Sequence, residues 1–479
     1  MQNYSFKKTG LLLLLSSSFI LTSCVELNHP ITQDQKNKLV NNWIQGYMDV
    51  VYLWNTRMSV QKDKTLFPAD YFKSLLYKTE DHFSYIAEDY TELSDYLSGI
   101  QMEAGYDFTL LRTGNDEDVV GIINYIKPHS LAASTSLKRG DIFRTVNGKQ
   151  LTLKNYQQLV KEMSAAHTLG VSRNNTIQTL SLKVGRYEEN PVLLDSLYTI
   201  GGKKIAYLIF NFFSVDKGDN SYAYLTGLNK IFGKYKQANV DELILDFRYN
   251  GGGQVTVATA LAGMISNRTS SDLFSIDQYN SIVDKQFKEK YGNDYNKTFF
   301  SDSLIIQNEG GTVITRVPYN KLTGLKRLYV LTSDRTASAS ELVINGLKPY
   351  MTVVLVGGKT YGKNVGMWFI YEENSKKQKN NRWGMLPIVV KTYNSANKSD
   401  YSKGFDPTVK TDEYAVLPLL PLGDTHELLL EAALNHIGVQ KPNAARSAEE
   451  RFNAQALMSS IDLTPVRNNM IINNLDLYE

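Results

Sequence analysis

Between residues 195 and 440, apolar runs of strand length alternate with helical patterns, and this alternation constrains the fold of the 479-residue chain more than any other feature. Residues 204–213, 241–250, 327–333 and 352–358 are predicted strands. Residues 223–235, 251–265 and 338–348 are predicted helices, the second preceded by a glycine turn, and a polar stretch at about 270 to 310 resembles an insertion. This order predicts an α/β fold whose sites form at strand ends and in the turns that follow them.

The N-terminus has the pattern of an export signal. Lys7 and Lys8 precede an apolar run over residues 10–21 that is too short to span a bilayer comfortably. The run ends in Leu21, Thr22, Ser23 and Cys24, which resembles a bacterial lipoprotein cleavage site. That resemblance implies removal of residues 1–23 and lipidation of Cys24, the sole cysteine, which cannot form an intramolecular disulfide. The alternative is an ordinary signal peptide with an incidental cysteine.

The segment after the signal predicts a tether and then a helical domain. Residues 24–35 are expected to be the tether, and residues 36–100 the helical domain. The first helix has apolar residues at three- to four-residue spacing, namely Leu39, Trp43, Tyr47, Val51 and Trp54. A second helix is expected after Pro68, with Tyr71, Phe72, Leu75 and Leu76 as its apolar stripe. These aromatic residues are interpreted as core.

Residues 101–190 are predicted to be a small β-domain that resembles the PDZ family. Gly140 and Asp141 form a turn into one strand, and Asn147 and Gly148 form a hairpin turn after it. The resemblance places the carboxylate-binding loop at Gly105, Tyr106, Asp107 and Phe108. Such a domain binds an extended peptide end as an added strand. Asp107 would set a negative charge near an incoming carboxylate, and the alternative is a β-domain without a ligand.

Composition and motifs exclude several other classes. Lys and Arg number 52 against 49 Asp and Glu, so a net charge of +3 gives no basis for nucleic acid as a partner. The six His and one Cys are not clustered at ligand spacing, and no metal or other cofactor is expected. Gly357, Gly362 and Lys363 resemble a phosphate loop, but Asn364 replaces the required Ser or Thr and a strand-like run follows instead of a helix. No Gly-x-Ser-x-Gly elbow is present.

A serine and a lysine fit the remaining chemistry. Ser338 is predicted at or just before a helix start, where free backbone N–H groups favour negative charge. The 25 residues to Lys363 allow one helix, one strand and one turn, which can return both side chains to one edge of the sheet. A lysine is a base only when neutral, and apolar surroundings such as Met367, Trp368 and Phe369 would lower its pKa.

Three segments then carry a family resemblance: LILDFRYNGGG, TASASE and GKTYGKNVG, in this order after a PDZ-like domain, resemble the carboxyl-terminal processing, or tail-specific, peptidases. The lipoprotein form common in Bacteroidetes fits best, and the resemblance covers most of residues 35–440. It implies a spiral α/β, ClpP/crotonase-like core in residues 195–440. It also implies that Ser338 is the nucleophile, Lys363 the general base, and the N–H groups of Gly252 and Ala339 the oxyanion donors. Gly251 departs from a frequent proline, and Met367 stands where many members have a glutamine that orients the lysine.

The expected function is therefore a lipid-anchored serine endopeptidase of the cell envelope, periplasmic or at the outer membrane. It would cleave unfolded or C-terminal polypeptide segments delivered by the PDZ-like domain. The alternative is a catalytically inactive peptide-binding adaptor lipoprotein. Ser340, Ser333 and Thr336 are alternative hydroxyls, and Ser338 could simply cap a helix. Residues 441–479 are polar and irregular and receive no role.

Overall fold

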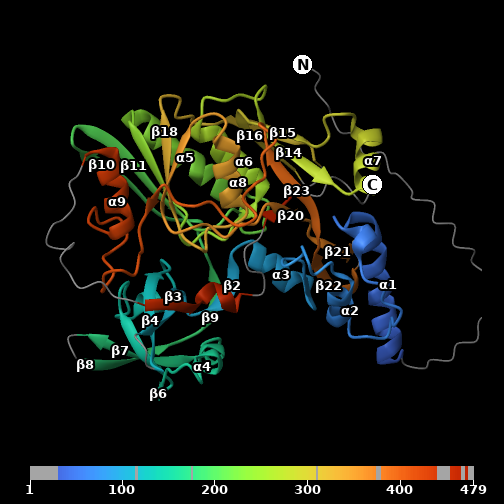
Figure 1. Cartoon of the computed structure of the whole chain (residues 1–479), viewed down its shortest axis with the longest axis horizontal. Helices are drawn as coiled ribbons and strands as arrows, with labels where there is room; N and C mark the ends of the chain where they lie inside the picture. Colours follow the sequence, from blue (N-terminus) through green and yellow to red (C-terminus); the bar gives the residue numbers. More distant parts are fainter. Residues whose placement is uncertain are drawn as a thin grey trace, which may run out of the picture.

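The computed structural model describes residues 31–113, 117–173, 176–308, 311–373, 379–439, 454–464 and 470–472. Figure 1 shows an α/β body, a β-rich domain below it, and a group of helices from the N-terminal part beside them. Cys24, residues 1–23 and most of the predicted tether lie outside the described residues.

The central sheet of the body has six strands in the order β10-β11-β12-β18-β19-β24. These are β10 (Val192–Ile200), β11 (Lys203–Phe210), β12 (Glu242–Asp246), β18 (Arg327–Thr332), β19 (Thr352–Gly357) and β24 (Val409–Lys410). All pairs are parallel except β10 with β11. Helices α5 (Ala223–Ala238), α6 (Val255–Ile265) and α8 (Ala339–Leu347) share one core with the sheet, and α9 (Leu428–Ile437) packs in another. The predicted α/β order is confirmed.

A second sheet of the body has the order β13-β26-β20-β23-β14-β15. Its strands are β13 (Gly253–Gln254), β26 (Met470–Ile471), β20 (Val365–Met367), β23 (Ile388–Asn394), β14 (Leu273–Tyr279) and β15 (Lys297–Phe299). The stretch of residues 270–310, interpreted from its polarity as an insertion, supplies β14, β15, helix α7 (Ser281–Tyr291) and strand β16 (Ser303–Gln307). That interpretation was wrong, because β14 and β15 are strands of the second sheet, and Phe274 of β14 and Val283 of α7 are buried.

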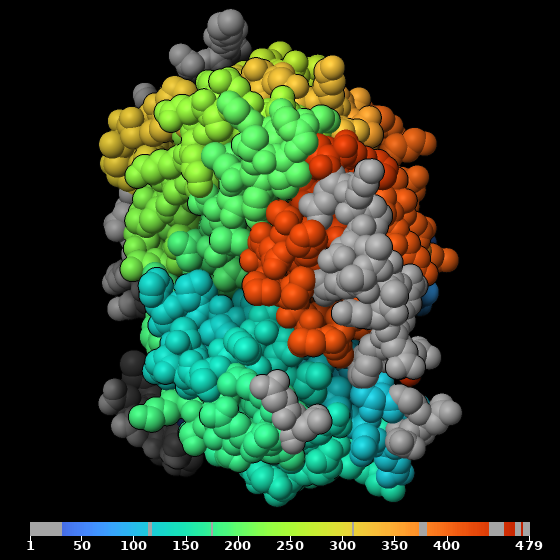
Figure 2. Space-filling model, turned by 90° about the vertical axis from the view of Figure 1, so that its left-hand side faces the viewer, coloured from blue at the N-terminus to red at the C-terminus, as the bar shows by residue number. Residues whose placement is uncertain are grey.

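The β-domain sheet has the order β25-β3-β4-β5-β7-β8. Its strands are β3 (Tyr106–Thr113), β4 (Val119–Ile126), β5 (Ile142–Val146), β7 (His167–Arg173), β8 (Thr176–Leu182) and β25 (Ala454–Ser459). Strand β2 (Ile100–Glu103) pairs with β9 (Gly185–Glu188), and helix α4 (Tyr156–Glu162) completes the domain. On the second face of the sheet, Leu419 packs against Leu111, Val120 and Ile122. Figure 2 shows the orange segment that contains Leu419 reaching down over the cyan β-domain.

The C-terminal segment is more ordered than its polarity predicted. Residues 454–464 form β25 and a short 3-10 helix, η3 (Ser460–Leu463), and residues 470–471 form β26. Each strand pairs with a distant part of the chain, β25 with β3 and β26 with β13 and β20. Partners this remote in sequence leave no local signal, so the irregular appearance of residues 441–479 was misleading.

The N-terminal part contains α1 (Gln33–Val51), α2 (Pro68–Leu75) and α3 (Tyr90–Leu97), as well as β1 (Tyr85–Ala87), which pairs with β22 (Lys379–Leu386). The two predicted helices are present, but the buried face of α1 differs from the predicted stripe. Leu39 is 65% exposed, whereas Ile44 and Met48 are fully buried. Buried Asn41 explains the rotation, because its side-chain amide donates to the carbonyls of Lys64 and Leu66 and fixes that face inward. These helices share a core with the second sheet.

Helix α8 allows a test of the packing that positions the loop of Ser338. A methyl group on Gly346 would lie 2.2 Å from a ring carbon of buried Phe274, whereas one on Gly227 in α5 would meet nothing within 4 Å. Gly346→Ala should therefore lower the free energy of unfolding by roughly 1–3 kcal/mol. Gly227→Ala should raise it by about 0.5–1 kcal/mol. Urea unfolding of both variants measures this, and a Gly346→Ala protein as stable as the parent would contradict the described packing.

Candidate active site

Ser338 lies at the turn between β18 and α8. It immediately precedes Ala339, the first residue of α8, and is fully buried. Its φ of 63° lies in the left-handed region, which is unusual for serine and marks a sharp, strained turn. The turn is held by the N–H of Ala337, which donates to the carbonyl of Asn250 at 3.1 Å. The predicted position of Ser338 at the helix start is confirmed.

The neighbouring hydroxyls are engaged with backbone carbonyls. Ser340 Oγ donates to Asn250 O at 3.2 Å, Thr336 Oγ1 donates to Phe247 O at 2.8 Å, and Ser333 Oγ donates to Arg248 O. Ser338 Oγ is buried and faces the N–H of Glu341 as in a capping box, but it makes no hydrogen bond of normal geometry with the residues that the structure describes. Of the four hydroxyls considered from the sequence, Ser338 is thus the one available for a new contact.

Lys363 lies in the loop after β19 and is fully buried. Its Nζ is 3.5 Å from Met367 Sδ and 4.9 Å from the centre of the Phe83 ring. Burial lowers the pKa of Lys363 to about 7, although the negative charges of Asp81 and Glu341 act in the opposite direction. Met367 was expected near the lysine and lies there, where its thioether is a weak acceptor.

Two residues near Lys363 come from the N-terminal part of the chain and were not predicted from the sequence. Phe83 covers the ammonium, and Asp81 is held near it by accepting from Tyr52 Oη at 2.8 Å and from the N–H groups of Phe83 and Ser84. Trp368, expected to contact the lysine, packs with Tyr279 and Phe287 in the core of the second sheet. No spacing rule connects residues 81–83 to residue 363, so only the fold reveals this arrangement.

Glu341 joins the serine and lysine segments. Its Oε2 accepts from the backbone N–H of Ser338 at 2.9 Å and from that of Lys363 at 2.8 Å. Its Oε1 accepts from Thr360 Oγ1 at 2.6 Å and from the N–H of Gly362 at 2.8 Å. Burial raises the pKa of this carboxyl group, and the four donors partly offset the rise. The sequence motif contained Glu341, but its role was not predicted.

The glycine turn of residues 251–253 lies against the same loop. The N–H of Gly252, predicted to stabilise an oxyanion, donates to Asn250 Oδ1 at 2.8 Å. Asn250 also anchors the turn, because its Nδ2 donates to Phe210 O at 2.6 Å. Ala339, the other predicted donor, is the first residue of α8, where a backbone N–H has no acceptor within the helix. In this conformation Gly252 would have to exchange its partner before it could bind an oxyanion.

The predicted carboxylate-binding loop is built differently from the expectation. Asp107 is buried and ion-paired with Arg335, at 2.6 Å between carboxylate and guanidinium, and it also accepts from Asn124 Nδ2 at 2.6 Å. Burial by itself would raise the pKa of Asp107, but Arg335 makes the net shift downward. Asp107 therefore does not present an uncompensated charge to a ligand, because Arg335, three residues before Ser338, neutralises it.

The other three residues of that loop have structural roles. Gly105 has a φ of +89°, and a Cβ there would lie 2.1 Å from the Cβ of Ser130. Tyr106 and Phe108 point into the β-domain core, where Tyr106 Oη lies 2.7 Å from His167 Nε2. The backbone of β3 pairs with β4 on one edge and with β25 on the other.

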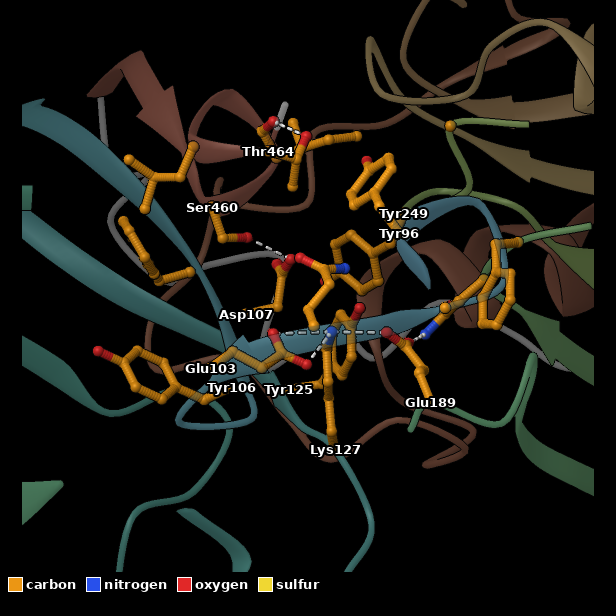
Figure 3. A pocket seen from close by; sticks show the side chains of 18 of the residues that line it. Tyr96, Glu103, Tyr106, Asp107, Tyr125, Lys127, Glu189, Tyr249, Ser460 and Thr464 are labelled. Carbon is orange, nitrogen blue, oxygen red and sulfur yellow. Dashed lines mark hydrogen bonds and ion pairs between the residues drawn. The ribbon is translucent and has the colours of Figure 1, made fainter. Parts of the chain in front are cut away.

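A cavity of about 250 Å³ lies between the β-domain and the body. It reaches from Asp107 and Arg335 to Gly251 and Gly252, and η3 lines one side. Figure 3 shows Lys127 between two carboxylates, with Nζ at 2.8 Å from Glu103 and 2.5 Å from Glu189. Both buried cations of the cavity, Lys127 and Arg335, are thus already paired with carboxylates.

A second ion-pair cluster connects the β-domain to the central sheet. Arg248, fully buried after β12, pairs with Asp246, Glu413 and Glu427. Arg139 of the β-domain contacts the same two glutamates. In the ranges that the structure describes, no helix is long and apolar enough to cross a membrane, and no group of three or more His, Cys, Asp or Glu could hold a metal ion.

The site thus combines a buried serine at a helix start with a buried lysine, and one carboxylate accepts from the backbone N–H groups of both residues. Residues 204–411 match the model of Peptidase family S41, and residues 40–85 match that of the Peptidase S41 N-terminal domain. The chain belongs to peptidase family S41.

The chain is also similar to several solved structures. A protein described as an S41 protease from Bacteroides fragilis NCTC 9343 is 27% identical, with a TM-score of 0.62 over 83% of this chain and 98% of that chain. The photosystem II D1 C-terminal processing protease is 16% identical, with a TM-score of 0.44 over 82% of this chain and 96% of that chain. A peptidase from Parabacteroides merdae ATCC 43184 is 15% identical, with a TM-score of 0.32 over 84% and 96% of the two chains.

Glu341 gives a direct test of the site geometry. Glu341→Gln replaces one acceptor oxygen with an NH₂ group, which cannot accept from two of the four donors. We expect the rate of peptide hydrolysis to fall roughly 10- to 100-fold, because small displacements of reacting groups are costly. Steady-state kinetics with the protein held below its unfolding temperature measure this effect.

The matched control is Glu242→Gln, which alters another buried carboxylate at the far end of β12, where Arg327 and Lys203 are its partners. It should lower stability without changing the rate. Equal rates in the parent and Glu341→Gln proteins would contradict the proposed role of Glu341.

Proposed function

We propose that this S41-family protein is a serine endopeptidase in which Ser338 is the nucleophile and Lys363 the general base. The observation that carries the proposal is the shared acceptor: one oxygen of Glu341 binds the backbone N–H of both residues. Burial keeps a large fraction of Lys363 neutral near pH 7, as a base requires. The buried hydroxyl of Ser338 has no hydrogen-bond acceptor among the described residues, so it is available to donate to a neutral Lys363.

The reaction would proceed in two halves. Neutral Lys363 takes the proton of Ser338 as Oγ attacks a peptide carbonyl, and the new C–O bond gives a tetrahedral oxyanion. The N–H of Ala339, and that of Gly252 once released from Asn250, would donate to this oxyanion. The protonated lysine then gives its proton to the departing amine. Water, deprotonated by Lys363, releases the acid and restores Ser338.

We propose that the β-domain acts as the PDZ-like module for substrates that are unfolded or C-terminal polypeptide segments. The edge of β3 that pairs with β25 in this structure would accept an extended chain in place of β25, and the backbone of that chain would supply most of the affinity. Since Asp107 and Arg335 neutralise each other, recognition of a free carboxylate is not the dominant contribution. The cavity from Asp107 to Gly252 would then lead the bound chain towards Ser338.

The proposed location is the cell envelope, with the body tethered to a membrane through lipidated Cys24. This part of the proposal is supported by the sequence pattern before Cys24 alone. The spiral form of the α/β core and the separate helical N-terminal domain likewise follow from the family resemblance, and the mixed α/β fold is compatible with them.

One observation favours the alternative of a catalytically inactive peptide-binding adaptor, namely the engagement of the Gly252 N–H by Asn250. An inactive protein would, however, have no need for a buried lysine with a lowered pKa, because burying that amine costs stability. We therefore favour the peptidase.

Cleavage of unfolded casein tests the proposal. The parent protein should cleave it, and Ser338→Ala should abolish the cleavage. Ser340→Ala, which changes a buried hydroxyl in the first turn of α8 and one of the alternative hydroxyls, should retain it. Casein cleavage by Ser338→Ala at the parent rate would show that the nucleophile is wrong. Absence of cleavage by the parent would support the adaptor.

A further inference from the structure

The C-terminal segment follows the course that a bound polypeptide would take. Strand β25 lies antiparallel on the edge of β3, from Ala454 opposite Thr113 to Ser459 opposite Thr109. It is the outermost strand of the β-domain sheet, in the position where an extended peptide would be added to β3. The chain's own residues therefore already occupy the edge assigned above to substrate.

Side chains of this segment make specific contacts along the same course. Leu457 and Met458 pack against the β-domain core. The hydroxyl of Ser460 donates to the carboxylate of Asp107, as Figure 3 shows. Ile461 and Leu463 line the cavity that reaches the glycine turn. The contacts thus comprise an apolar pair, then a hydroxyl, then further apolar residues.

Strand β26 of the segment lies beside two parts of the candidate active site, the glycine turn and the strand that follows Lys363. In β26, Met470 is paired in parallel with Gly253, and Ile471 with Gln254 and Met367. The N–H of Ile472 donates to the carbonyl of Met367 at 3.0 Å. β26 therefore lies between the glycine turn that carries one predicted oxyanion donor and the strand that follows Lys363.

The C-terminal segment and a substrate cannot both pair with the same edge of β3. Each backbone N–H and C=O on the edge of β3 that faces away from β4 can pair with only one added strand. The contact is nevertheless of modest burial, because Gln455 and Ala456 are exposed and Leu457 and Met458 only half-buried. A weakly buried edge strand can separate from its sheet at a small cost compared with the fully buried β4.

We propose that residues 454–464 and 470–472 of this chain occupy its polypeptide-binding track, which runs along the edge of β3 and past Asp107 to the glycine turn, and compete with substrate for it. Substrates bind along the same track, as an extended strand with adjacent apolar residues on the β-domain and a hydroxyl-bearing residue at Asp107. Competition with substrate rests on the proposed peptidase function, whereas occupation of the track does not. The inference rests on three observations: β25 pairs with β3, Ser460 donates to Asp107, and Ile461 and Leu463 line the cavity.

A disulfide lock tests the occupation directly. Gln455 lies opposite Arg112, so the full chain with Gln455→Cys and Arg112→Cys, with Cys24→Ser removing the native thiol, can bond the segment to β3. The probe is a fluorescein-labelled synthetic peptide of residues 454–472, and its binding is followed by fluorescence anisotropy. Oxidation should weaken binding by more than roughly tenfold, and reduction should restore it. Gln455→Cys alone is the control and should not respond to oxidation.

Release of the segment should have the opposite effect. The double variant Leu457→Asp and Met458→Asp removes both apolar contacts, and we expect tighter binding of the labelled peptide and several-fold faster casein cleavage. The matched control, Ile177→Asp with Ile314→Asp, introduces the same charges at exposed positions away from the track. It should behave as the parent does.

The outcomes separate this inference from the proposed function. Peptide binding that responds to the lock in a protein that cleaves nothing would support the occupied track and overturn the peptidase. Casein cleavage at equal rates in the oxidised, reduced and released forms, with unchanged peptide binding, would overturn the inference and leave the peptidase intact. Equal peptide binding by oxidised and reduced proteins overturns the inference in either case.

Discussion

The carboxylate of Glu341 is the contact on which the arrangement of the site depends. It lies one turn into α8 and reaches back to the helix start and across to the loop after β19, so that four donors converge on two oxygens. A backbone hydrogen bond from the N–H of Tyr361 to the carbonyl of Thr336 also joins these two segments, and Glu341 adds contacts to the N–H groups of Ser338 and Lys363 themselves. A buried carboxylate with four short hydrogen bonds has little freedom to move, and it therefore helps to fix the relative position of Ser338 and Lys363, which are 25 residues apart.

Buried charged residues also connect the β-domain and the N-terminal part to the segments that carry Ser338 and Lys363. Arg335, in the loop that carries Ser338, forms an ion pair with Asp107 at the start of β3. Asp107 also accepts a hydrogen bond from Ser460 in the C-terminal segment. The N-terminal part contributes Phe83 and Asp81 to the surroundings of Lys363. A single buried charge without its partner is costly, so these pairs make the position of each part sensitive to the others. Occupation of the β3 edge is thereby connected to the loop of Ser338 through one ion pair.

Local patterns in the sequence predicted much of the fold and of the candidate site. The features that were not predicted share one physical cause. The alternation of strands and helices, the helix start at Ser338 and the approach of Met367 to Lys363 all follow from neighbours within a few turns of chain. The rotated face of α1, the paired state of Asp107, the role of Glu341 and the two C-terminal strands depend on partners far away in sequence. Buried polar groups such as Asn41 and Asp107 look like surface residues until their partners are known.

The central claim is that Lys363 activates Ser338, and the rate of Ser338 labelling by a fluorophosphonate as a function of pH tests it most directly. The adduct is located by peptide mass mapping. Neutral lysine is the base, and its fraction rises with pH, so the rate should increase from pH 5.5 with a midpoint near the Lys363 pKa of about 7 and then level off. Lys363→Ala should give no adduct on Ser338. A rate independent of pH, an adduct on another residue, or undiminished labelling of Lys363→Ala would contradict the account.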